Sequence, residues 1–100
     1  MYKVRAARQA KKDAVFIERA GLRTQVDEII ETVGRNPFET SQDFEELKGQ
    51  WKGIYSRRIS RKHRFVYVVL PNVDNELDEN EVPYEGIVKA LTMWTHYEQL

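Results

Sequence analysis

The sequence holds few groups that could do catalysis, and they suit proton transfer without a metal. There is no cysteine among the 100 residues, and the two histidines, His63 and His96, have no partner at the spacing of metal ligands. The five glycines are scattered and form no phosphate-binding loop. We therefore expect no metal and no cofactor, which leaves acid–base chemistry by carboxylates and histidines, or simple binding.

Polar residues that could act together lie at both ends of the predicted strands. His63-Arg64 opens one strand, His96-Tyr97 closes another, Glu45-Glu46 precedes a third, and Ser56-Arg57-Arg58 lies on that third strand. If the strands are neighbours, these residues converge on the sheet face that the helices leave open. Side chains alternate along a strand, so only one of Arg57 and Arg58 can face a given ligand.

Charge is balanced in sum but not in distribution. Lys and Arg together number 16, as do Asp and Glu. Residues 47–64, the basic block, contain no acidic residue, and residues 72–86, the acidic block, contain no basic one. Cations of the basic block suit phosphates. The acidic block also holds Pro, Asn and Gly, and is therefore predicted to be a solvated loop.

The spacing of apolar residues predicts an α+β protein. Residues 7–20 and 22–33 carry apolar side chains at helical spacing, and Gly21 is a suitable stop between them. Residues 65–70 are apolar on both faces, which is typical of a central strand. We expect a single domain over residues 1–100, ordered β-α-α-β-β-β, with a two-helix hairpin on one face of a small antiparallel sheet. The expected strands are 2–6, 54–59, 65–70 and 87–95.

No segment of the sequence suits a membrane. The longest apolar run, residues 65–70, is far shorter than a membrane span needs, and the first residues lack the apolar core of a signal peptide. We therefore expect a soluble cytoplasmic protein.

Five short motifs follow one another along the chain: Asn36-Pro37-Phe38-Glu39, Glu45-x-Leu47-Lys48-Gly49, Gly53–Ile59, His63–Tyr67 and His96-Tyr97. Together they resemble the Txe/YoeB family of toxins, within the RelE/ParE superfamily of bacterial toxin–antitoxin systems. The resemblance is dense over residues 35–69 and returns at His96-Tyr97. It implies a RelE-like fold, ribosome-dependent cleavage of mRNA, and inhibition by a cognate antitoxin with a partly disordered tail.

The same resemblance implies roles for individual residues. Glu45 is the expected general base and His96 the general acid, although Glu46 could exchange roles with Glu45. Arg64 would stabilise negative charge in the transition state, and Tyr97 would stack on a base or orient the phosphate. Further contacts to RNA are expected from residues in or beside the basic block, namely Lys48, Arg57, Arg58, Arg61 and His63.

Two features depart from the family pattern. Three residues, 98–100, follow the His-Tyr pair, and the acidic block lengthens the link between the last two strands. That link could shield the basic face, contact a partner or be a surface insertion. These departures leave open a binding module without catalysis. Related ParE-type toxins also leave open a toxin that targets DNA gyrase, although the presence of the Glu, His and Tyr set argues against it. The sequence does not determine the oligomeric state and leaves a homodimer open.

Overall fold

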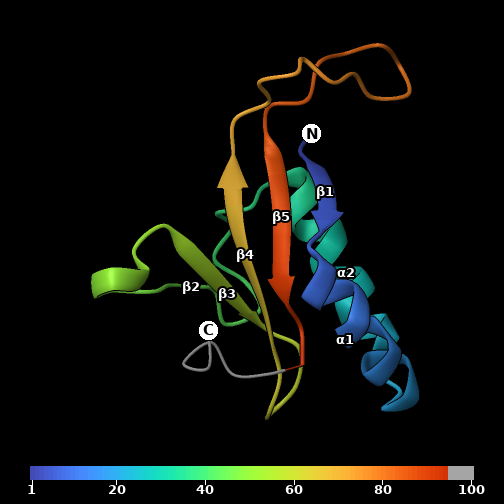
Figure 1. Cartoon of the computed structure of the whole chain (residues 1–100), viewed down its shortest axis with the longest axis vertical. Coiled ribbons are helices and arrows are strands. Elements are labelled where there is room, and N and C mark those ends of the chain that lie inside the picture. Colours follow the sequence, from blue (N-terminus) through green and yellow to red (C-terminus); the bar gives the residue numbers. More distant parts are fainter. Residues whose placement is uncertain (95–100) are drawn as a thin grey trace.

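The computed structural model describes residues 1–94, which form a five-stranded sheet with two helices on one face (Figure 1). The order across the sheet is β1-β5-β4-β3-β2. This confirms the predicted α+β class and the two-helix arrangement. The strands are β1 (Lys3–Ala6), β2 (Glu45–Glu46), β3 (Ile54–Arg58), β4 (Arg64–Leu70) and β5 (Ile87–Thr92).

The sheet is mixed, whereas the sequence predicts an antiparallel one. Strands β2 to β5 are antiparallel neighbours, but β1 runs parallel to β5, with Val4 opposite Val88. The two strands lie near opposite ends of the chain, so no short turn sets their relative direction. Strand β2 is also additional, because residues 45 and 46 were expected in a connection. Its Glu45 is opposite Ser56 of β3.

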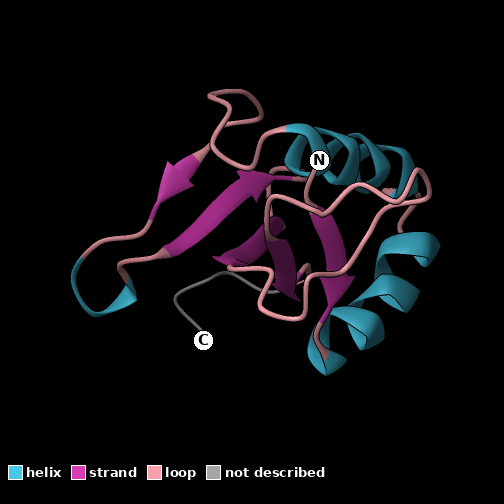
Figure 2. Ribbon diagram, turned by 90° about the horizontal axis from the view of Figure 1, so that it is seen from above, coloured by secondary structure: helices cyan, strands magenta, loops and turns pink. Residues whose placement is uncertain are grey.

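The helices α1 (Arg8–Arg19) and α2 (Arg23–Arg35) cover one face of the sheet (Figure 2). Gly21, with a φ of 72°, occupies the left-handed conformation that ends α1, as its position predicts. Within residues 1–94, neither helix is long and apolar enough to cross a membrane. Their buried apolar side chains, at the predicted spacing, are Ala10, Ile17, Val26, Ile29 and Val33.

Strand β4 is the middle strand, and its first half is buried from both sides. Phe65 and Tyr67 face the helices and join the core, while Val66 faces the other way, and all three are at most 1% exposed. A central strand of this kind explains the unbroken apolar run. Arg64 is the first residue of β4, and the buried residues that follow it fix its backbone position at one end of the sheet.

The acidic block lies in the link between β4 and β5, residues 71–86, at the end of β4 opposite Arg64 (Figure 1). Asn72 holds the link by donating to the carbonyls of Glu76 and Tyr84. The Glu76 carboxylate accepts from Lys3 at 2.9 Å and from Arg5 at 2.6 Å. The seven residues of β4 span about 20 Å, so this link contacts β1 rather than the neighbourhood of Arg64.

Candidate active site

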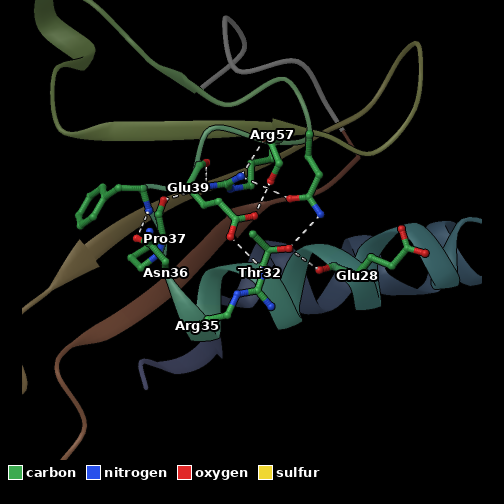
Figure 3. Close-up of polar contacts among 10 residues, drawn as sticks. Glu28, Thr32, Arg35, Asn36, Pro37, Glu39 and Arg57 are labelled. Carbon is green, nitrogen blue, oxygen red and sulfur yellow. Dashed lines mark hydrogen bonds and ion pairs between the residues drawn. The ribbon is translucent and has the colours of Figure 1, made fainter.

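The two arginines of β3 face opposite sides of the sheet, and only Arg58 is exposed. Arg57 is 0% exposed and has its guanidinium donors engaged inside the protein (Figure 3). This burial argues against the predicted contact of Arg57 with RNA. Its acceptors are the Tyr67 hydroxyl at 3.0 Å and the carbonyls of Pro37, Ser41 and Glu39 at 3.1, 2.9 and 2.6 Å.

These contacts attach the segment after α2 to the sheet. The backbone N–H of Arg58 also donates to the carbonyl of Gln42 at 2.8 Å. Gln42 and Asp43 then take left-handed conformations, with φ values of 53° and 54°. Arg57 holds the residues before Gln42 against the sheet, and the left-handed conformations of Gln42 and Asp43 then turn the chain. Asp43 thereby reaches the exposed end of β3 and β4.

Asp43 lies between two arginines of neighbouring strands. Arg58 and Arg64 are directly opposite each other in the β3–β4 pair. One carboxylate oxygen of Asp43, Oδ2, lies 3.0 Å from a terminal nitrogen of Arg64 and 3.2 Å from one of Arg58. The hydrogen bond from Arg64, followed by its charge, lowers the pKa of Asp43. Asp43 belongs to none of the sequence motifs, so its role could not be predicted from them.

Arg64 is held by more than this carboxylate. Its Nε donates to the hydroxyl of Ser56, and its other terminal nitrogen donates to the backbone carbonyl of Asp43 at 2.6 Å. The side chain is only 12% exposed. The guanidinium is therefore positioned by β3 on one side and by the Asp43 backbone on the other.

The register of β2 separates the two candidate carboxylates. Glu45 is opposite Ser56 and Glu46 is opposite Tyr55. Opposed residues of an antiparallel pair share a face, so Glu45 lies on the face of Ser56, the residue that accepts from Arg64. Glu46 lies on the other face with Tyr55, whose pKa is raised by burial and then by the Glu46 charge. This arrangement favours Glu45 over Glu46 as a partner of Arg64.

The remaining predicted RNA contacts differ in their surroundings. Lys48 and Arg61 are exposed, the first after β2 and the second in the turn between β3 and β4. His63 is half-buried and stacks on the Trp94 ring, with 3.9 Å between ring centroids, while its Nδ1 contacts the Trp94 carbonyl. These contacts indicate that His63 holds Trp94 in place, and they argue against a contact between His63 and RNA.

The chain is also held where it approaches the predicted catalytic pair. The backbone N–H of Met93 donates at 2.9 Å to the carboxylate of Asp13, which is 2% exposed. Phe16 stacks on Trp94 with 5.5 Å between ring centroids. His96 and Tyr97 themselves lie outside the described residues, so their predicted approach to Arg64 stays a prediction.

Within residues 1–94, Glu45, Arg58 and Arg64 lie on the sheet face away from the helices, where Ser56 and Val66 are buried and Arg58 is exposed. Glu45 and Lys48 line a hollow of about 540 Å³ beside β2, together with Glu46, Leu47 and Trp51. A different hollow, of about 370 Å³, lies between the helices and the sheet, where Ala10, Ile17, Val26 and Phe65 contribute to its lining. It contains none of the predicted site residues. A surface with paired guanidinium groups is suited to a polymer that carries phosphates.

Comparison with known proteins identifies the family. Residues 7–97 match the family described as YoeB-like toxin of bacterial type II toxin–antitoxin system. The chain belongs to the YoeB-like toxin family. The resemblance seen in the sequence motifs is thereby confirmed.

Relatives and solved structures agree with this YoeB-like assignment. Toxin YoeB of Escherichia coli O6:H1 strain CFT073 is 44% identical over 45 residues, which are 45% of this chain and 54% of that protein. The chain thus spans about half the length of the curated relatives it matches. The YoeB/ParE toxin from Agrobacterium tumefaciens is 27% identical, with a TM-score of 0.73 over 95% of this chain and 99% of that one. The YoeB–YefM complex from Staphylococcus aureus is 25% identical, with a TM-score of 0.67 over 97% and 99%.

Proposed function

We propose that this chain is the toxin of a type II toxin–antitoxin pair and that it cleaves mRNA on the ribosome without a metal. One observation mainly supports the proposal: Arg58, Arg64 and Glu45 share the sheet face that the helices leave open. Membership of the YoeB-like family supports the class of reaction. A substrate on the ribosome requires a cytoplasmic location.

RNA supplies its own nucleophile, the ribose 2′-hydroxyl. In the proposed reaction the Glu45 carboxylate takes the proton of this hydroxyl, and the 2′-oxygen forms a bond to phosphorus. The bond from phosphorus to the 5′-oxygen breaks, and His96 gives its proton to that oxygen. The products are a 2′,3′-cyclic phosphate and a 5′-hydroxyl.

The cationic residues serve the phosphate in this scheme. Arg64 stabilises the negative charge that grows on the phosphate oxygens, and its fixed guanidinium needs little rearrangement to do so. Arg58, Lys48 and Arg61 are exposed and contact neighbouring phosphates of the RNA backbone. Tyr97 stacks on a base or orients the reacting phosphate.

The proposed partner is a cognate antitoxin. A YoeB–YefM toxin–antitoxin complex is known from Staphylococcus aureus, for a chain 25% identical to this one. We expect the antitoxin of this chain to inhibit by covering or displacing the catalytic residues with a segment that folds on binding. Formation of a homodimer stays a prediction.

The test is cleavage of an mRNA bound to ribosomes, comparing Glu45→Gln with Glu46→Gln. Both variants remove one negative charge from β2, and Glu46→Gln is the matched control because its residue faces the other side. We expect Glu45→Gln to lower the cleavage rate by about 10²–10⁴-fold, the usual contribution of a general base. Glu46→Gln should stay within a few-fold of wild type. Equal rates for wild type and Glu45→Gln would refute the assignment of the base.

Two further measurements separate the alternatives. His96→Gln should abolish cleavage, and wild-type cleavage should persist in excess EDTA; activity that depends on added Mg²⁺ would contradict a metal-free reaction. Ribosome binding without cleavage would instead support a binding module without catalysis. Inhibition of supercoiling by purified gyrase would support a gyrase-targeting toxin.

A further inference from the structure

The carboxylate of Asp43 occupies the position in which an anion would meet both Arg58 and Arg64, on the sheet face away from the helices. Arg58 and Arg64 are cross-strand partners, so their positive charges repel unless an anion lies between them. The Asp43 Oδ2 lies within 3.2 Å of both guanidinium groups. Among the ion pairs of residues 1–94, each of these arginines is paired with Asp43 alone.

Arg64 does not depend on this carboxylate for its position. Ser56 accepts from its Nε, and the backbone carbonyl of Asp43 accepts from one terminal nitrogen. Both contacts remain if the Asp43 side chain turns away. The carboxylate is therefore the one replaceable contact of the Arg64 guanidinium among those described.

The exposure of the two side chains supports an exchange. The Asp43 side chain is 55% exposed, whereas that of Arg64 is 12% exposed. The Asp43 carboxylate can therefore turn into solvent at a small cost in free energy, while the Arg64 guanidinium stays against the sheet. The backbone of Asp43 also stays in place, because the residues before it are bonded to Arg57 and Arg58.

We propose that the Asp43 carboxylate is an internal competitor that holds the Arg58–Arg64 pair until an RNA phosphate displaces it. The proposal rests on the proposed function for its ligand class, an RNA phosphodiester. Asp43 thereby lowers the affinity for phosphate and makes binding depend on an exchange of one anion for another. Without it, the two guanidinium groups would attract any polyanion more strongly.

The experiment compares Asp43→Asn with Asp27→Asn in binding to a fluorescent RNA whose 2′-hydroxyls are methylated. Methylation blocks the nucleophile, so binding is measured without cleavage. Asparagine keeps the size of the side chain and tolerates the left-handed backbone of residue 43. Asp27 is the matched control, because it is an exposed aspartate of α2 that pairs with Arg23, away from the site.

We expect Asp43→Asn to bind this RNA roughly three- to tenfold more tightly than wild type at about 50 mM salt, as expected for removing exposed ion pairs. The difference should shrink as salt is raised, and Asp27→Asn should match wild type. Unchanged or weaker binding by Asp43→Asn would overturn the proposal and make the carboxylate a structural partner of the arginines.

A measurement on the wild-type protein covers the case in which Asp43→Asn does not fold. The carboxyl ¹³C signal of Asp43 should shift toward that of a solvated carboxylate when the methylated RNA binds, while the Arg64 Nε–H signal stays in place. An unmoved Asp43 signal with RNA bound would overturn the proposal. Tighter binding by Asp43→Asn in a protein that never cleaves RNA would leave this inference standing and remove only the proposed reaction.

Discussion

Replacing Arg57 by Met tests whether this arginine attaches the segment after α2 to the sheet or instead contacts a ligand. The substitution keeps a long side chain in the core but removes every hydrogen-bond donor. The carbonyls of Glu39 and Ser41 then lose the Arg57 donor, whereas the Pro37 carbonyl still accepts from Tyr67 at 2.6 Å. We expect the segment after α2 to detach from the sheet more easily.

The magnitude follows from these contacts. Two partly buried carbonyls left unpaired cost about 1 kcal/mol each. The contact of the guanidinium with the Phe44 ring, 4.7 Å from its centroid, adds about 1 kcal/mol when lost. The expected loss of about 3 kcal/mol in the free energy of unfolding is a large part of the 5–15 kcal/mol that is typical of a domain. It corresponds to a fall in Tm of roughly 12–24 °C for a chain of this size.

The assay is urea unfolding followed by circular dichroism, with Arg58→Met as the matched control on the adjacent residue. The Arg58 side chain is 55% exposed and forms one ion pair within residues 1–94, so its loss should change the free energy of unfolding by less than about 1 kcal/mol. The reasoning is refuted if Arg57→Met unfolds at the wild-type urea concentration, or if Arg58→Met is the less stable variant.

Two further predictions concern carboxylates. Asp13→Ala leaves the buried N–H of Met93 without an acceptor, so it should lower the free energy of unfolding by about 1–3 kcal/mol in urea titrations. Asp13→Asn keeps an acceptor and should lose less stability. Equal losses for the two variants would contradict this account. Hydrogen bonds from Lys3, then from Arg5, lower the pKa of Glu76 from its ordinary value of 4.5. Its stabilisation is therefore fully present above pH 4.5 and lost as pH falls through the lowered pKa. The stability difference between wild type and Glu76→Gln should be constant at neutral pH and disappear in acid, and a difference that grows in acid would contradict the sign.

The sequence by itself determined the helices, the central strand and the family. Helical spacing of apolar residues ending at Gly21 is a local property, as is the apolar run of β4, and both depend on neighbours a few residues apart. The motifs around Glu45 and Arg64 were sufficient to indicate the family. The strand period also showed that Arg57 and Arg58 face opposite ways.

Only the tertiary structure decided which face became the core and what the arginines contact. The sequence could not show that Arg57 is the buried one, because that depends on the side of the sheet that the helices cover. The pairing of Asp43 with Arg64, 21 residues later, depends on strand register and on two left-handed residues that carry no motif. The parallel direction of β1 likewise depends on pairing with a strand that is distant in the sequence. Contacts between distant parts of the chain depend on how the whole chain packs, and the local spacing of apolar residues does not predict them.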